Sequence, residues 1–354
     1  MKNFLKLNVV ICTTLISSTL LSQSFTGSWT ELGPFGSTNG GTNYQGRIVC
    51  FAENPASSNI IYFGGESGGL WKRNESTNTA ELLNTDGLER IGVAEIAIHP
   101  SSGTTSEEML IGTGSNYAIQ FLDGNVQNER RFTSSGIYRT TNGGDTWTQV
   151  LSWQSIMNPG SPGSVTEKEN TVQIAKIMYN RDDPSKVLAA VRKPEGNNPN
   201  DWGRLYRSVD YGVTWTEVID SHISDRYFFD METSPGNANT VYLSSHRLYK
   251  STDFGVTWDD VTNNLTGLNI DASSDKSFIV IETAPVGSNS TYDDWVGVAT
   301  NNQSVGGAKE LFISTDGLSS AIDNKVIGAT YSIPINRYNH SFEVGYNFNK
   351  VFFG

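Results

Sequence analysis

The chain has 354 residues, which suits one large repeat domain better than one small core. Its formal net charge of −12 argues against nucleic acid or an anionic membrane surface as partner, because both require basic patches. Its two cysteines, Cys12 and Cys50, are too few for a disulfide framework.

Residues 1–23 have the pattern of a secretory signal peptide. Lys2 and Lys6 precede an apolar run diluted by Ser and Thr, and small residues follow it. This run is too short and too polar for a membrane span, and we expect no other spanning segment. The sequence therefore predicts export, to a secreted, cell-surface or periplasmic location, with 24–354 as the mature chain.

From residue 46 onward, short apolar runs alternate with turns. Each unit has a first strand such as VQIAKIMYN, a second such as KVLAAVR, a third such as RLYRS and a fourth such as TWTEV. The units occupy 46–84, 91–152, 172–220, 227–263 and 276–326. Four short strands per unit, without a helical period, are typical of a propeller blade. We predict an all-β fold, a β-propeller of four-stranded blades with five visible blades.

A ten-residue segment recurs between the third and fourth strands, as YRTTNGGDTW at 138–147, YRSVDYGVTW at 206–215 and YKSTDFGVTW at 249–258. Eroded copies occupy 70–80 and 311–320. The shared residues have backbone roles in a hairpin: the acidic or amide side chain accepts N–H groups, glycine adopts a positive φ, and tryptophan packs on neighbouring strands. These structural residues are Asn142, Gly144, Trp147, Asp210, Gly212, Trp215, Asp253, Gly255, Trp258 and Asp316.

The pattern S-x-D-x-G-x-T-W between two short strands resembles the Asp-box, or BNR repeat. That repeat occurs in sialidases, sortilin-type receptors, xyloglucanase-type glycoside hydrolases and a photosystem assembly factor. The resemblance covers nearly all of 28–354 and implies an Asp-box β-propeller. It does not imply one function, because such folds host many.

The two ends of the chain resemble parts of a further blade. Residues 28–33, SWTELG, look like a fourth strand without a third, and HSFEVGYNFNKVFFG at 340–354 looks like first and second strands. We expect an incomplete sixth blade and a chain truncated at its C-terminus, since open strand edges promote aggregation.

Most long insertions fall at the end of the blades opposite the repeated hairpins, in 113–135, 152–171, 193–204 and 301–309. Because binding sites lie on loops displayed by a rigid scaffold, this inserted-loop end is the candidate functional surface. The ligand-binding candidates are Tyr117, Phe121, Asp123, Arg130, Arg131, Trp153, Trp202 and Arg204. Aromatic rings with charges suit a carbohydrate or a peptide. The alternative is that Trp153 and Trp202 anchor long loops by packing.

Two functions remain open. The first is a non-catalytic exported propeller that binds polysaccharide or protein, and the second is a glycoside hydrolase of the xyloglucanase or sialidase type, which needs two carboxylates around the scissile bond. A sialidase Arg-Ile-Pro motif is only echoed by Arg47-Ile48-Val49, so no catalytic residue can be transferred. We expect no metal and no cofactor, because His99, His222, His246 and His340 are dispersed and phosphate-binding loops are absent from the sequence.

Overall fold

The computed structural model describes residues 38–39, 42–43, 48–66, 68–85, 88–89, 92–114, 134–164, 172–192, 203–221, 223, 228, 230–264, 277–284, 290–302, 308–320, 325–327, 342–344 and 351–353. The predicted signal peptide and the predicted strand at 28–33 lie outside these residues. Among the described residues, no helix has the length and apolar character needed to span a membrane.

Five four-stranded antiparallel sheets make up most of the described chain. The first contains β3 (Ile48–Asn54), β4 (Ser57–Gly65), β5 (Gly69–Asn74) and β6 (Thr79–Leu82). The second contains β7 (Val93–Ile98), β8 (Met109–Thr113), β9 (Gly136–Thr140) and β10 (Thr148–Ser152). The third contains β11 (Gln173–Tyr179), β12 (Val187–Arg192), β13 (Arg204–Ser208) and β14 (Thr216–Glu217).

The fourth sheet contains β15 (Asp230–Thr233), β16 (Val241–Ser244), β17 (Leu248–Ser251) and β18 (Asp259–Asp260). The fifth contains β19 (Ser277–Thr283), β20 (Val296–Asn302), β21 (Ala308–Ser314) and β22 (Lys325–Ile327). Two-stranded sheets form from β1 (Thr38–Asn39) with β2 (Thr42–Asn43), and from β23 (Phe342–Val344) with β24 (Val351–Phe353). The short helical segments are α2 (Trp153–Met157), η3 (Pro162–Ser164), η6 (Thr262–Asn264) and η7 (Ser290–Tyr292).

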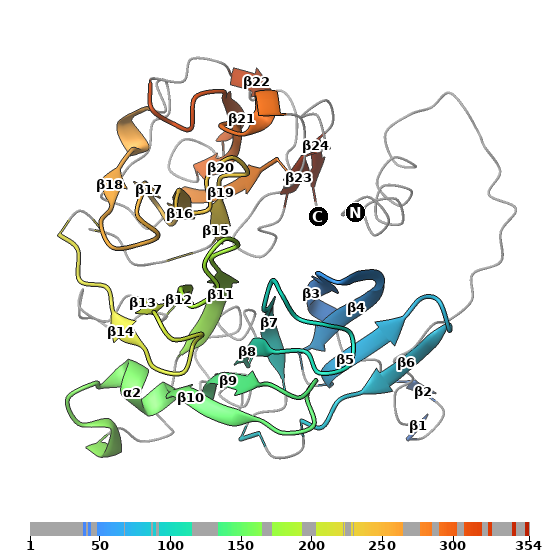
Figure 1. Cartoon of the computed structure of the whole chain (residues 1–354). Helices are drawn as coiled ribbons and strands as arrows, with labels where there is room; N and C mark the ends of the chain where they lie inside the picture. The colour runs from blue at the N-terminus through green and yellow to red at the C-terminus, as the bar shows by residue number, and fades with distance from the viewer. Residues whose placement is uncertain are drawn as a thin grey trace, which may run out of the picture.

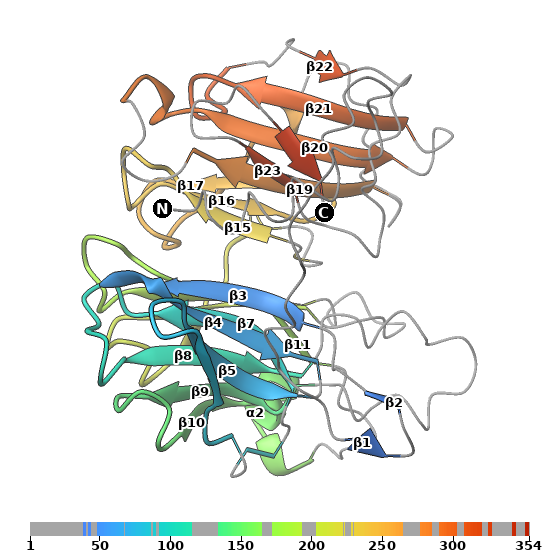
Figure 2. The same cartoon turned by 90° about the vertical axis from the view of Figure 1, so that its right-hand side faces the viewer.

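The sheets are arranged as blades around a common axis, as Figure 1 shows. Within each blade the strands pair in chain order, and the first strands β3, β7, β11, β15 and β19 lie nearest the middle. Each first strand contacts the next one along the chain, and β19 contacts β23. Figure 2 shows the blades from the side, with the strands seen along their length. The predicted all-β propeller with five blades is confirmed, and β23–β24 begins a sixth sheet.

The hydrophobic core lies between consecutive blades. One cluster of buried side chains joins Tyr62 and Leu70 of the first blade to Met109 and Ile111 of the second. Further clusters join the second blade to the third, the third to the fourth and the fourth to the fifth. Burial of apolar surface therefore stabilises the contact between neighbouring sheets, and a single blade has no core of its own.

The repeated hairpin is held by its own polar side chains. In the third blade, Asp210 Oδ1 accepts the backbone N–H of Thr214 at 2.8 Å, and Asp210 Oδ2 accepts its hydroxyl at 2.6 Å. Ser208 Oγ donates to Asp210 Oδ1 at 2.7 Å and accepts the Gly212 N–H at 2.9 Å. Asp253, Asn142 and Asp316 make corresponding contacts, which confirms the predicted Asx-turn.

Two consecutive residues of the turn have positive φ in blades two to five, and the sequence predicted only one of them. The predicted glycines Gly212 and Gly255 have φ of 79° and 77°, but Tyr211 and Phe254 before them have φ of 64° and 54°. A left-handed tyrosine or phenylalanine is strained, so the surrounding contacts must hold it. In blades three and four this residue donates its N–H to the loop between first and second strands, Tyr211 to Ser185 O and Phe254 to Asn239 O, both within 2.9 Å.

The turns also connect neighbouring blades. A Cβ on Gly212 would lie 2.7 Å from Leu110 Cδ1 of the preceding blade, and a Cβ on Gly255 would lie 2.6 Å from Leu188 Cδ2. Arg207 Nε donates to Phe254 O at 3.0 Å, and Lys250 Nζ donates to the Gly317 carbonyl of the fifth blade at 2.6 Å. The turn of the fourth blade therefore accepts both a packing contact and a cationic donor from the blade before it.

The tryptophans of the turns pack at the same interfaces. Trp258 is 1% exposed in the cluster between blades three and four. Trp215 and Trp147 are partly buried against the two preceding clusters. The three indoles therefore lie at the interfaces between consecutive blades.

We predict that Asp253→Ala lowers the free energy of unfolding by about 1–2 kcal/mol, because it removes the acceptor for Val256, Thr257 and Ser251. Asp253→Asn should cost less, because Asn142 holds the same turn in the second blade. Although burial raises it, these donors hold the pKa of Asp253 below its usual value, so its stabilisation should be lost as the pH falls through that pKa. Urea denaturation of the full chain measures each loss, and equal losses for both variants would contradict the prediction.

Candidate functional site

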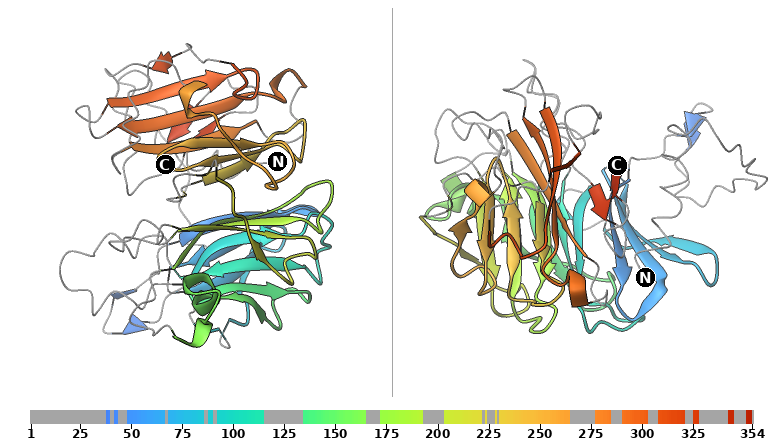
Figure 3. Two further views of the ribbon diagram at one scale, coloured as in Figure 1. Left: turned by 90° about the vertical axis from the view of Figure 1, so that its left-hand side faces the viewer. Right: turned by 90° about the horizontal axis from the view of Figure 1, so that it is seen from above.

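The inserted-loop end is defined by topology. Because strands alternate in direction, the loops β8–β9, β10–β11, β12–β13 and β20–β21 all leave the end opposite the Asp-box turns. Six of the eight predicted ligand-binding residues lie outside the described residues: Tyr117, Phe121, Asp123, Arg130, Arg131 and Trp202. Trp153 and Arg204 are described, and Figure 3 shows the helix α2 that carries Trp153 at the edge of the second blade.

Trp153 is the first residue of α2 and is 3% exposed. Its ring belongs to the cluster between blades two and three, with Ile156 and Val172, and its indole N–H donates to Glu89 Oε1 at 3.4 Å. The helix was not expected from the sequence; Ser152 caps it by accepting the Ser155 N–H at 3.1 Å. Trp153 therefore has the loop-anchoring position that we gave as the alternative to ligand contact.

Arg204 takes part in a cross-strand ion pair at the start of β13. Its Nη1 lies 2.5 Å from Glu217 Oε2 on β14. The next blade has the same pair, since Arg247 Nη1 lies 2.6 Å from Asp260 Oδ2. This repetition indicates that Arg204 also serves the blade structure, with its side chain 21% exposed at the inserted-loop end.

A charged group near the axis was missed by sequence reasoning. Glu95, Lys176 and Asp230 occupy equivalent positions on three consecutive first strands, opposite Gly112, Ala190 and Ser244 of the second strands. A register shift before Glu95 and before Lys176 changes the direction of each side chain. Comparing the first strands of the blades position by position would have revealed these three charged residues.

These residues interact across three blades. Lys176 Nζ lies 3.5 Å from Asp230 Oδ1 and 3.4 Å from Glu232 Oε1. The side chains of Lys176, Asp230 and Glu232 are 29%, 17% and 18% exposed. We call Glu95, Lys176, Asp230 and Glu232 the axial charge cluster. Three carboxyl groups face one ammonium group, so the cluster has an excess of acid.

Burial sets the protonation of the axial charge cluster. Burial raises the pKa of Glu95 to about 7 and that of Asp230 to about 6, and Lys176 opposes both increases. Although burial lowers it, Glu232 and Asp230 raise the pKa of Lys176 well above its usual value. Lys176 is therefore charged, and Glu95 holds or releases a proton near neutral pH. Such groups donate and accept hydrogen bonds, as hydroxyl-rich ligands require.

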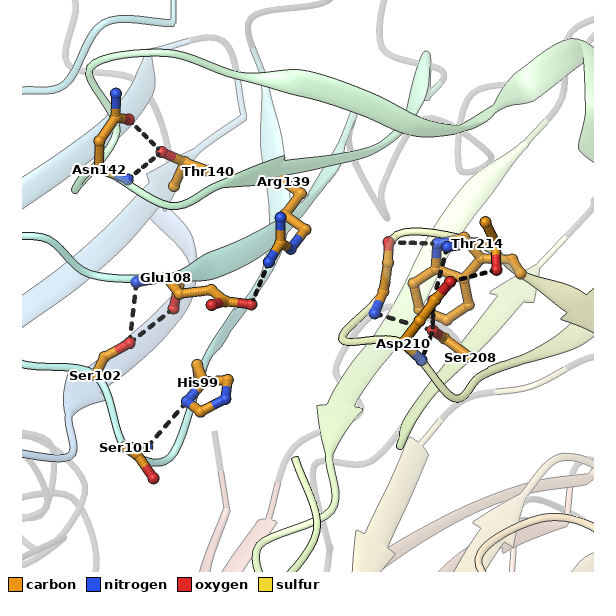
Figure 4. A network of polar contacts seen from close by, with 12 residues as sticks. His99, Ser101, Ser102, Glu108, Arg139, Thr140, Asn142, Ser208, Asp210 and Thr214 are labelled. Atoms are coloured by element: carbon orange, nitrogen blue, oxygen red, sulfur yellow. Dashed lines mark hydrogen bonds and ion pairs between the residues drawn. The ribbon is translucent and has the colours of Figure 1, made fainter. Parts of the chain in front are cut away.

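The Asp-box end has a different character, shown in Figure 4. Arg139 Nη2 donates to Glu108 Oε1 at 2.7 Å, and His99 Nδ1 accepts the Ser101 N–H at 3.1 Å. The His99 ring packs against Tyr211 of the next blade, with centroids 5.8 Å apart. These contacts join neighbouring strands, a loop and the turn of the next blade.

Metal ligation has no candidate in the part of the chain that the structure describes, where no three His, Cys, Asp or Glu side chains form a group that could hold an ion. Cys50 is buried, and its Sγ donates to Val93 O at 3.4 Å. Burial raises the pKa of the Cys50 thiol well above its usual value, so Cys50 packs as a small buried hydrophobe.

The fold and its turns define the chain as a β-propeller with Asp-box hairpins. No family model matches it. In sequence it is 26% identical over 225 residues to a xyloglucanase of Hypocrea jecorina (strain QM6a), covering 57% of this chain and 23% of that protein. The predicted resemblance to xyloglucanase-type propellers is confirmed as a similarity.

Two solved structures share the fold. An ancestral GH74 enzyme matches with a TM-score of 0.55 and 16% identity, over 91% of this chain and 35% of that chain. The GH74 xyloglucanase from Xanthomonas campestris matches with a TM-score of 0.50 and 14% identity, over 87% of this chain and 50% of that chain. The chain thus spans at most half the length of these three relatives.

We predict that Glu95→Gln weakens the dependence of stability on pH. The pKa of Glu95 is higher in the folded chain than its usual 4.5, so the folded state binds more protons between these values. Its contribution is therefore most favourable below pH ~4.5 and is lost as the pH rises toward ~7. The change in unfolding free energy between pH 5 and pH 8 should shrink by about 1–3 kcal/mol in the variant.

Urea denaturation at both pH values measures this change. The control is Glu81→Gln, which removes an exposed carboxylate from the outer strand β6. An unchanged pH dependence in Glu95→Gln, or the same change in both variants, would show that Glu95 titrates normally.

Proposed function

We propose that this chain is an exported polysaccharide-binding propeller without hydrolase activity of its own, with the inserted-loop end as its binding surface. The observation that carries the proposal is the similarity in sequence to a xyloglucanase over 225 residues, combined with the propeller fold. The polysaccharide is proposed from that relative's name, and the export from the N-terminal signal pattern. A protein ligand at the same surface is the competing partner.

The geometry supports the inserted-loop end over the Asp-box end. Most of the long insertions leave the blades there, and a rigid scaffold that displays loops favours binding. The axial charge cluster lies toward the same end, because Asp230 is the first residue of β15 and Glu95 the third of β7. Tyr117, Phe121, Asp123, Arg130, Arg131, Trp202 and Arg204 are the proposed ligand contacts.

We prefer binding over hydrolysis because two carboxylates of the axial charge cluster, Asp230 and Glu232, are paired with Lys176. A glycoside hydrolase needs two carboxyl groups ~5–9.5 Å apart that act on either side of the scissile bond. Asp230 and Glu232 instead share one partner, Lys176. Their interaction with the ammonium group is part of the contact between blades three and four.

Hydrolysis is the second candidate, and one observation favours it. Burial raises the pKa of Glu95 to about 7, which is the range of a general acid. In that case Glu95 would protonate the leaving oxygen, and Asp230, with a pKa of about 6, would be the second carboxylate.

The decisive experiment uses the full secreted chain with xyloglucan, and with mannan and pectin as other polysaccharides. We expect retardation in an affinity gel containing xyloglucan, and no increase in reducing ends on long incubation. Release of sugar that Glu95→Gln abolishes would establish the second candidate instead. Failure to bind any polysaccharide would refute both.

Variants at the two ends locate the surface. We predict that Trp202→Ala and Tyr117→Ala each weaken polysaccharide binding about tenfold, roughly 1.4 kcal/mol, because aromatic residues dominate such contacts. Tyr211→Ala, which removes a 45% exposed ring at the Asp-box end, should leave the affinity unchanged. The reverse pattern, measured by calorimetry or gel retardation, would place the ligand on the Asp-box end.

A further inference from the structure

The axial charge cluster holds more carboxyl groups than cationic groups. Lys176 Nζ lies 3.5 Å from Asp230 Oδ1 and 3.4 Å from Glu232 Oε1. The charges of Glu95 on β7 and Glu282 on β19 also act on this ammonium group, and these first strands lie nearest the middle of the molecule (Figure 1). Four carboxyl groups from three blades thus act on one lysine, so the cluster favours a further positive charge.

A buried glutamine lies beside this cluster. Register pairs Gln173 with Arg192 on β12. A register shift follows on β11, and the next pair on the same face is Lys176 with Ala190. This face is directed at the fourth blade, because Ala190 packs in the cluster between blades three and four and Arg192 Nε donates to Phe228 O at 3.0 Å. Neighbouring pairs on one face are about 7 Å apart, so Gln173 is next to Lys176 and its carboxylates.

The amide group of Gln173 is unpaired. The residue is 1% exposed, and neither its side-chain oxygen nor its side-chain nitrogen has a hydrogen-bond partner among the described residues. Buried polar groups are usually paired, as Thr113 Oγ1 is with Ser135 Oγ at 2.8 Å at the same end of the second blade. An unpaired buried amide destabilises a fold. Its position beside the cluster therefore points to a ligand that supplies both a donor and an acceptor.

We infer that the axial charge cluster and Gln173 form a subsite for an amino sugar. The protonated amine supplies the positive charge that Glu95 and Asp230 favour, and ring hydroxyl groups supply the donor and acceptor for the Gln173 amide. The side chains of Lys176, Asp230 and Glu232 are partly exposed, so the cluster is accessible. A uronic acid is disfavoured, because its carboxylate is repelled by the excess of acid. This subsite goes beyond the proposed function, since it does not use the proposed contacts of the inserted loops.

Calorimetry of the full chain at neutral pH with three matched trisaccharides tests the need for an amine. Linear trimers of glucosamine, N-acetylglucosamine and glucose with the same linkage share the ring skeleton, and only the first carries ammonium groups. We expect the glucosamine trimer to bind about tenfold more tightly than the other two, because it alone forms charge-assisted hydrogen bonds with the carboxylates. Equal affinities of the three trimers, or no binding of the glucosamine trimer, would overturn the inference.

Free glucosamine in a separate titration distinguishes the two sources of this chemistry. An affinity equal to that of the trimer would assign the subsite to a single amino sugar. A lower affinity would assign it to one residue of an amino-sugar polysaccharide.

Variants test whether the ligand lies at the axis. Glu95→Gln and the control Glu81→Gln each remove one carboxylate, but Glu81 is exposed on the outer strand β6. Attraction to the net charge of −12 alone would weaken equally in both variants. We expect instead about a tenfold loss of affinity for the glucosamine trimer in Glu95→Gln and no loss in Glu81→Gln.

Gln173→Met separates ligand contact from a structural role. It should lower the affinity about tenfold while the resistance of the chain to urea stays the same or rises, because the variant removes an unpaired buried polar group. Lower resistance to urea with unchanged affinity would show that Gln173 is structural. Unchanged affinity in both Glu95→Gln and Gln173→Met would overturn the subsite.

Failure of the subsite and failure of the proposed function give different results. Retention by xyloglucan together with equal affinities for the three trimers would leave the proposed function standing and overturn the subsite. Binding of the glucosamine trimer that Glu95→Gln weakens, without retention by any polysaccharide, would establish the subsite and refute the proposed function.

Discussion

The structure depends on one local interaction, which we call the clamp. In each clamp a hydroxyl and a carboxylate or amide oxygen accept backbone N–H groups around two residues of positive φ. Ser208 and Asp210 together take up the N–H groups of Gly212 and Thr214. Without those acceptors, a turn with Tyr211 at φ 64° would relax toward a common hairpin. These contacts within the turn, together with the Tyr211 N–H donated to Ser185 O of the neighbouring loop, fix the direction of the turn.

That fixed direction is what allows the blades to be joined. The clamp brings the carbonyl of Phe254 within 3.0 Å of Arg207 Nε, and it brings Gly255 against Leu188. A Cβ at Gly255 would lie 2.6 Å from Leu188 Cδ2, so the Leu188 side chain would have to shift. A short polar motif thus determines the spacing of an apolar interface, which explains why it recurs once per blade.

The fold was predictable from sequence because the same four-strand unit recurs along the chain. The Asp-box hairpins and the alternating strands define their own boundaries, and β13 begins and ends with the expected third strand RLYRS, 204–208. The candidate site was not predictable in the same way. Lys176 meets Asp230 and Glu232 only after register shifts and blade packing bring distant strands together. The sequence placed Trp153 on a loop as a ligand contact, but α2 directs its side chain into the core between two blades.

The same logic separates the two ends of the molecule. At the Asp-box end, polar groups such as Asp210 and Arg139 are consumed by the contacts that hold turns and blades, so few remain for a ligand. At the opposite end, the four long insertions of the sequence leave the blades, and one of them places Trp153 in the cluster between blades two and three. The axial charge cluster lies toward that end, and burial there raises the pKa of Glu95 to about 7. A repeat that makes one end uniform therefore leaves the other as the place where sequence, and with it function, can change.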